Sequence, residues 1–157
     1  MESPAEMPSG TSRDHVVLVV DDEPEVLSAI RRFFRDESFS IATADSSEAA
    51  LDLLKTMEID LLIADERMPV MTGTQLLRKA RDCSPGTTRA LLTGYPSAAM
   101  VGLGFEAGAD AFIFKPWDEP TLRETVRGIM RGKAGEARRA DSTGSSERSF
   151  DVGGEGG

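Results

Sequence analysis

The stretch Val16-Val17-Leu18-Val19-Val20-Asp21-Asp22-Glu23-Pro24 decides the fold class of this chain. Its continuous β-branched run is typical of a parallel strand that is buried on both faces. The acidic residues stop the run, and Pro24 suits the first turn of a helix. Such a helix is indicated by apolar residues that fall on one face at helical spacing: Val26, Leu27, Ile30, Phe33 and Phe34.

The same alternation of strand and helix continues along the chain. Further strands are expected at 39–43, 60–64, 89–92 and 111–114, each followed by a segment of helical period. The helix after 89–92 is expected to start near Ser97, to present Met100, Val101 and Phe105, and to stop near Gly108 in a left-handed C-cap. Strict alternation of five strands with five helices predicts an α/β fold, with a parallel sheet covered by helices on both faces.

Composition predicts one domain flanked by two tails. A chain of 157 residues with 39% hydrophobic content supports one ordinary core. We expect a folded domain over 15–132, a disordered arm over 1–14 and a disordered Gly- and Ser-rich tail over 133–157. No segment is typical of a signal peptide or of a membrane span, so a cytoplasmic location is expected.

The charge and the cysteine count exclude several classes of function. The formal net charge of -9 and the pI near 4.7 disfavour a nonspecific electrostatic grip on nucleic acid or anionic lipid. The single cysteine, Cys83, cannot form an intramolecular disulfide or a thiolate cluster for zinc. A protein partner or a small ion is therefore expected.

Polar residues stand where four of the expected strands end. They are Asp21 with Asp22, Asp65, Thr93 and Lys115. Because ligands of open parallel sheets bind outside the carboxyl ends of the strands, these side chains should converge.

Three converging carboxylates repel one another unless they take up protons or bind a cation. Oxygen ligands without His or Cys select Mg²⁺ or a similar ion. Lys115 and Thr93 suit the equatorial oxygens of a transferring phosphoryl group, and a carboxylate can act as its covalent nucleophile. Asp65 is the best candidate, because it stands alone at the end of the central strand while Asp21 and Asp22 form an ion-holding pair.

The segments 17–23, 65–73, 93–94 and 107–116 resemble the receiver domains of two-component response regulators, which are CheY-like. The resemblance covers about residues 14–132 and implies a doubly wound, flavodoxin-like (βα)₅ fold. It implies that Asp65 accepts phosphate from the phosphohistidine of a sensor kinase. It also implies that Asp22, Asp65 and the Arg67 carbonyl coordinate Mg²⁺, with Asp21 acting through water.

The resemblance further implies a switch and a route for the signal. Thr93 would move toward the phosphate, the aromatic Phe112 would reorient with it, and the Lys115–Pro116 bond would be cis. Output would pass through the surface made by the fourth helix, fifth strand and fifth helix. The expected partners are a sensor kinase or a histidine phosphotransfer protein, a downstream effector protein and a phosphorylation-dependent second copy. No enzyme activity is expected beyond self-catalysed phosphotransfer and dephosphorylation.

Four positions qualify the resemblance. Thr72 replaces the Asp common in the family, and both residues can cap a helix. Phe112 has no hydroxyl, so a switch there works by packing. Arg67, two residues after Asp65, lies where it can tune dephosphorylation. Trp117 is interpreted as a packing residue, with a binding role as the alternative.

Three rival functions compete with this interpretation. An aspartate-nucleophile phosphatase needs a second acid two residues after the nucleophile, where this chain has Arg67. A flavodoxin-like cofactor binder needs a phosphate cradle after the first strand, where Asp21-Asp22-Glu23 would repel phosphate. A receiver-like interaction module that takes no phosphate stays open, although every chemical position is filled.

Overall fold

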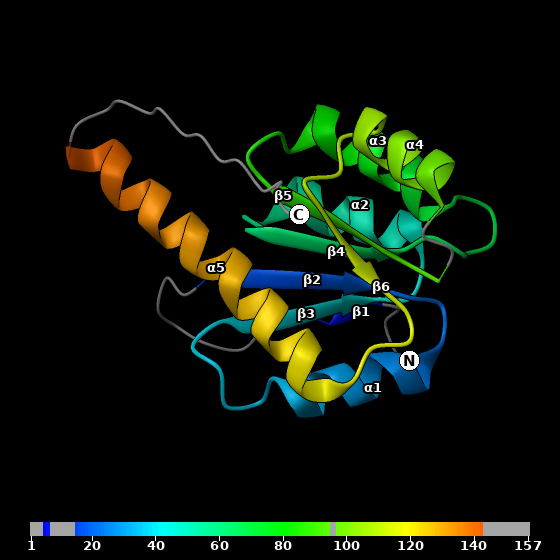
Figure 1. The fold of residues 1–157 in the computed structure, drawn as a ribbon, viewed down its shortest axis with the longest axis horizontal. Coiled ribbons are helices and arrows are strands. Elements are labelled where there is room, and N and C mark those ends of the chain that lie inside the picture. The colour runs from blue at the N-terminus through cyan, green and yellow to red at the C-terminus, as the bar shows by residue number, and fades with distance from the viewer. Residues whose placement is uncertain (1–4, 7–14, 95–96, 143–157) are drawn as a thin grey trace.

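The fold is a single sheet with helices on both faces (Figure 1). The structure is a computed structural model that describes residues 5–6, 15–94 and 97–142, with the side chains of 15–94 and 97–132. The strand order is β1-β3-β2-β4-β5-β6, and β2 to β6 pair in parallel, which confirms the predicted parallel sheet. The strands are β1 (Ala5–Glu6), β2 (Val16–Val20), β3 (Ser40–Ala44), β4 (Leu61–Asp65), β5 (Thr88–Thr93) and β6 (Ala111–Phe114).

In the described part of the chain, five helices cover the sheet, α1 and α5 on one face and α2, α3 and α4 on the other (Figure 1). Alternate residues of β2 separate the two cores. Leu18 and Val20 pack with α2 and α3, while Val17 and Val19 pack with α1 and α5. This two-sided burial explains why β2 is apolar at every position. The helices are α1 (Pro24–Phe33), α2 (Ser47–Thr56), α3 (Gly73–Cys83), α4 (Ala98–Glu106) and α5 (Glu119–Ser142).

Helix ends follow the predicted chemistry. The N-cap of α2 is Ser46, whose side chain accepts a hydrogen bond from the Ala49 N–H. Thr72 caps α3 and Ser97 caps α4 in the same way. Gly108, just past the end of α4, has a φ of +105°, as predicted for a left-handed C-cap.

The N-terminal arm differs from the expectation in one place. Ala5 and Glu6 form β1 and pair antiparallel with Ala44 and Thr43, at the outer edge of β3. The predicted disorder over 1–14 is wrong for these two residues, and the others lie outside the described part of the chain. An edge strand offers unpaired backbone groups to any segment that reaches it, and composition does not report this.

The apolar face of α4 also differs from the expectation. Phe105, which was expected on this face with Met100 and Val101, is 55% exposed, and the buried residue of this fully described helix is Gly104. A Cβ at Gly104 would lie 2.5 Å from Cζ of Phe112. The Phe112 ring thus fills the space that a large α4 side chain would need, and Leu103 and Phe105 on either side of Gly104 are exposed.

The last helix is longer than predicted. α5 runs to Ser142, whereas a disordered tail was expected from residue 133. The segment 133–142 contains three Ala, two Arg, one Lys and one Glu, residue types that add to a growing helix at little cost. Residues 143–157 of that tail lie outside the described residues. Within the described residues, no helix combines the length and apolar character needed to cross a bilayer.

Candidate functional site

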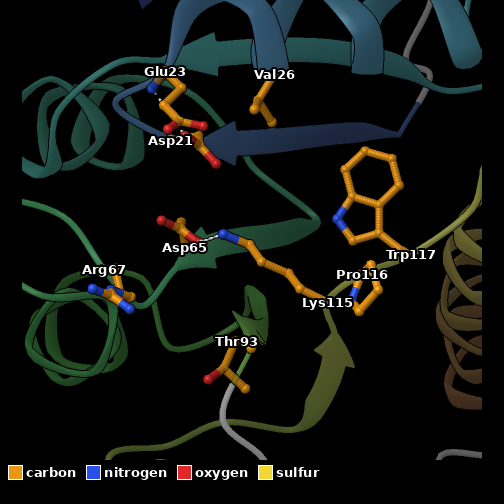
Figure 2. Close-up of a pocket in the computed structure, with 10 residues that line it drawn as sticks. Asp21, Glu23, Val26, Asp65, Arg67, Thr93, Lys115, Pro116 and Trp117 are labelled. Atoms are coloured by element: carbon orange, nitrogen blue, oxygen red, sulfur yellow. Dashed lines mark hydrogen bonds and ion pairs between the residues drawn. The ribbon is translucent and has the colours of Figure 1, made fainter.

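The candidate site lies at the carboxyl ends of β2, β4, β5 and β6 (Figure 2). Asp21 follows β2, Asp65 ends β4, Thr93 ends β5 and Lys115 follows β6. All four line one pocket of about 630 Å³, so the expected convergence is what the structure shows. The cause is topological, because parallel neighbouring strands present their carboxyl ends at the same edge.

Three carboxylates meet where Asp21 and Asp65 line this pocket. Carboxylate oxygens of Asp21, Asp22 and Asp65 all lie within 4.8 Å of one another, with Asp21 and Asp65 buried and Asp22 exposed. Lys115 faces the same group, with Nζ 2.6 Å from Oδ1 of Asp65 (Figure 2). The single ammonium does not balance three carboxylates, so the cluster keeps an excess of negative charge at neutral pH.

Within the residues that the structure describes, the Asp21 carboxylate has one oxygen with a hydrogen-bond partner and one oxygen without. Its Oδ1 accepts a hydrogen bond of 2.9 Å from the Glu23 N–H, which fixes the carboxylate across the end of β2. Its Oδ2 is buried and has no hydrogen-bond partner among the described residues. Burial, together with the nearby charge of Asp65, raises the pKa of Asp21 to about 6. Asp21 therefore needs a proton or a cation beside Oδ2.

Asp65 is held by its own backbone surroundings. The side of Gly73 that would carry a Cβ faces the Asp65 main chain, and a Cβ there would lie 2.5 Å from the Asp65 carbonyl oxygen. A glycine is therefore required for α3 to begin this close to Asp65. Burial raises the pKa of the Asp65 carboxyl, while Lys115 opposes that rise.

The loop between Asp65 and α3 is fixed by two caps. Oε1 of Glu66 accepts hydrogen bonds from the Thr74 N–H at 2.9 Å and from its hydroxyl at 2.6 Å. Thr72 and Gln75 form a reciprocal capping box, which confirms the predicted capping role of Thr72. These bonds hold the loop that carries Arg67 against the rigid start of a helix.

Lys115 is aimed by the end of β6. Its N–H donates to the Thr93 carbonyl at 2.9 Å, which continues the strand ladder for one further residue. The Lys115–Pro116 peptide is cis, as predicted. Figure 2 shows the Lys115 side chain crossing the pocket toward Asp65. Asp21 and Thr93 lie on opposite sides of this lysine side chain.

The residues of the cluster fit a hard divalent cation. Carboxylate oxygens are the ligands that Mg²⁺ prefers, and Oδ2 of Asp21 is already desolvated. A bound cation would also favour the charged form of Asp21, whose pKa is raised by burial and by the nearby charge of Asp65. Asp21, Asp22 and Asp65 could hold such an ion.

The pocket includes residues that the sequence reasoning did not assign to it. Glu23 and Val26 line it beside Asp21, and Pro116 and Trp117 line its far end. Trp117 also packs edge-to-face on Phe33 with ring centroids 5.9 Å apart, so its predicted packing role is confirmed. Because Trp117 directly follows Lys115-Pro116 in the sequence, its place at the border of the pocket could have been predicted from that position.

Two other predicted site residues lie at the periphery. The Arg67 side chain is exposed at the pocket edge. Phe112 lies outside the pocket residues, on β6, with its ring centroid 5.0 Å from that of Phe105 and 6.0 Å from that of Phe114. The structure thus places Phe112 in an aromatic cluster beside α4. Its role as a switch stays a prediction.

The sequence matches the family model described as the response regulator receiver domain over residues 17–127. Among curated proteins, it is 34% identical over 134 residues to the hydrogenase transcriptional regulatory protein HoxA of Cupriavidus necator, covering 83% of this chain and 28% of HoxA. It is 31% identical over 130 residues to the cell cycle response regulator CtrA of Brucella ovis, covering 82% of this chain and 55% of CtrA. The chain thus spans about half or less of the length of these relatives.

Solved structures agree with the sequence comparisons. A CheY-like receiver domain protein from Methanospirillum hungatei aligns with a TM-score of 0.73 and 28% identity, covering 78% of this chain and 98% of that one. The chemotaxis protein CheY4 of Vibrio cholerae aligns with a TM-score of 0.70 and 27% identity, covering 74% of this chain and 98% of that one.

Proposed function

The chain belongs to the response regulator receiver domain family of two-component signalling, and we propose that it takes a phosphoryl group on Asp65 from the phosphohistidine of a sensor kinase or of a histidine phosphotransfer protein. The observation that carries this proposal is the contact of 2.6 Å between Lys115 Nζ and Asp65 Oδ1, inside a cluster of three carboxylates. A buried carboxylate beside one ammonium and an acidic pair is suited to receive a phosphoryl group next to a cation.

Mg²⁺ is the cofactor that this site would take. Asp22, Asp65 and the Arg67 carbonyl would coordinate it, and Asp21 would help through water. When bound, the ion neutralises negative charge on the carboxylates and on the phosphoryl oxygens. Support comes from the unpartnered Oδ2 of Asp21 and from the raised pKa of that group.

The transfer itself is a displacement at phosphorus. One Asp65 carboxylate oxygen forms a bond to phosphorus as the bond from phosphorus to the donor nitrogen breaks. The imidazole leaves with that electron pair and takes up a proton, so a neutral histidine remains. Lys115 and Thr93 then donate to the phosphoryl oxygens, which draws both side chains away from their positions before transfer.

The signal would leave through the surface formed by α4, β6 and α5. On it Leu103, Phe105 and Phe114 are 51%, 55% and 43% exposed, and Phe112 packs beside them. Large apolar side chains gathered on a surface mark an interaction site. Movement of Thr93 at the tip of β5 would reach Phe112 through packing and change which partner binds, an effector protein or a second copy of the chain.

An experiment can distinguish two alternative functions from this proposal. A receiver-like module would bind partners at the same surface without taking phosphate. An aspartate-nucleophile phosphatase would hydrolyse phosphate monoesters, although Arg67 stands where that class needs an acid. Under the proposed function, the chain catalyses no reaction beyond the transfer of a phosphoryl group to Asp65 and the loss of that group.

The test measures binding of beryllofluoride, which imitates an aspartyl phosphate, by isothermal titration calorimetry. Wild type is expected to bind it only with Mg²⁺ present, and Asp65→Asn is expected to lose the binding. Asp52→Asn, which removes an exposed carboxylate on α2, is the matched control and should bind as wild type does. Equal binding by Asp65→Asn, or no binding by wild type, would exclude the proposal.

A further inference from the structure

The pocket around Asp65 is larger than the proposed reaction centre. It measures about 630 Å³, whereas a metal ion with its waters and a phosphoryl group fill on the order of 250 Å³, at about 30 Å³ for each water-sized group. The lining also includes three side chains that the proposed reaction centre does not use: Val26, Pro116 and Trp117 (Figure 2). Asp21 and Asp65 line one end of the pocket, with Val26 beside Asp21, and Pro116 and Trp117 line its far, apolar end.

Trp117 is a fixed wall of that apolar end. Its indole packs edge-to-face on Phe33 of α1, at a centroid distance of 5.9 Å. Both Trp117 and Val26 are only partly buried and rest on the core between α1, α5 and the sheet. The indole is therefore held from behind, while another part of it borders the pocket. A rigid aromatic surface needs little reordering to receive a flat group.

The geometry of phosphoryl transfer indicates which group could contact the surface of Trp117. The attacking and leaving atoms lie roughly in line through phosphorus, so the leaving group stands on the far side of phosphorus from Asp65. Figure 2 shows Lys115 running from Asp65 to its backbone beside Pro116, with Val26 and the Trp117 indole on the side of Lys115 away from Thr93. A leaving group that departs along that side of the pocket would meet Val26 and Trp117.

We propose that Val26 and Trp117 form a subsite for the leaving ring of the phosphodonor, which makes Trp117 a determinant of specificity for donors phosphorylated on an imidazole nitrogen. This inference rests on the proposed phosphorylation of Asp65. It adds that the chain selects its donor partly by the ring that leaves, and not by the phosphoryl group alone.

The chemistry of the step needs no further reactant. With phosphoimidazole, the bond from phosphorus to nitrogen breaks while Asp65 forms its bond to phosphorus, and the imidazole leaves with the electron pair and a proton. Phosphoramidate undergoes the same exchange with ammonia as the leaving group. The two donors therefore differ in the ring and share the type of bond that is broken.

The experiment compares these two donors on the full chain with Mg²⁺ present. Phosphorylation is followed by intact mass, and kcat/KM is measured for wild type, Trp117→Ala and Trp117→Phe. Wild type is expected to prefer phosphoimidazole. Trp117→Ala is expected to lose about tenfold with phosphoimidazole, in the range of aromatic pair contacts, and less than twofold with phosphoramidate. Trp117→Phe should recover most of the loss.

The phosphoramidate rate serves as the internal control for folding. An equal fall with both donors in Trp117→Ala would mean a merely structural role and would overturn the inference, as would an unchanged ratio of the two rates. Trp117→Leu, which keeps an apolar core contact without a ring, should show the same selective loss if the indole face is what the donor meets. Failure of wild type to react with either donor would overturn the proposed function as well, and so differs from failure of the subsite alone.

Discussion

Replacing Asp21 by Asn should make the metal-free protein more stable at neutral pH. The pKa of Asp21 rises from 3.8 to about 6 in the folded protein, chiefly through burial. Each pKa unit corresponds to about 1.4 kcal/mol, which gives a ceiling of about 3 kcal/mol for the cost of its charge. Because Lys115 and solvent in the pocket screen that charge, we expect a gain of about 1–2 kcal/mol in the free energy of unfolding.

The substitution keeps the local geometry. In Asp21→Asn the amide oxygen still accepts from the Glu23 N–H, as Oδ1 does now. The amide nitrogen replaces the unpartnered Oδ2 and offers a donor to the neighbouring carboxylates. The variant therefore removes a charge and an unsatisfied acceptor without leaving a cavity.

The pH dependence follows from the direction of the pKa change. The folded state binds more protons than the unfolded state between pH 3.8 and about 6. The stability that this proton contributes is present below pH 3.8 and is lost as the pH rises through about 6. The gap between variant and wild type should thus be near zero in acid and largest above pH 7.

Urea unfolding in a metal chelator, at pH 4 and pH 7.5, measures this gap. With Mg²⁺ at ten times its Kd, wild type should gain about 1.4 kcal/mol, and the variant, with one carboxylate fewer, should gain less. Asp52→Asn changes the net charge equally on exposed α2 and should show no gap. A variant no more stable than wild type at pH 7.5, or a gap independent of pH, would refute the reasoning.

Two further predictions concern packing and backbone strain. Gly104→Ala would put a Cβ 2.5 Å from Phe112 Cζ, so we expect a loss of about 1–3 kcal/mol in urea unfolding that Phe112→Val largely reverses. Gly102→Ala, in the same helix with nothing within 4 Å, should instead be neutral or stabilising, and a loss there would contradict the steric explanation. Val70 has a φ of 70° and is fully exposed, so Val70→Asn should raise the free energy of unfolding by about 1 kcal/mol. Val70→Ala keeps that backbone strain and should not, and equal values for both variants would reject strain as the cause.

Much of the candidate site could be predicted because its residues stand at the ends of strands. The positions of Asp21, Asp65 and Lys115 after apolar runs are visible in the sequence, and a parallel sheet brings such positions to one edge. The parallel sheet and the cis bond before Pro116 were predicted and are confirmed. Roles in catalysis and switching stay predictions.

Other features depend on contacts between segments that are far apart in the chain. The outward turn of Phe105 follows from the Phe112 ring lying against Gly104, and helical periodicity carries no record of that ring. The pairing of Ala5 and Glu6 with β3 depends on an open sheet edge. Composition reports how apolar a segment is, but not which neighbour it meets.

The sequence alone determined the alternation of strands and helices, and with it the meeting of three carboxylates and a lysine at one edge. Periodicity and strand direction are local properties, so they can be read along the chain. Only the tertiary structure decided that Oδ2 of Asp21 is buried without a partner and that Trp117 borders the Asp65 pocket. Burial and pocket shape depend on side chains from several elements at once, which no single segment specifies.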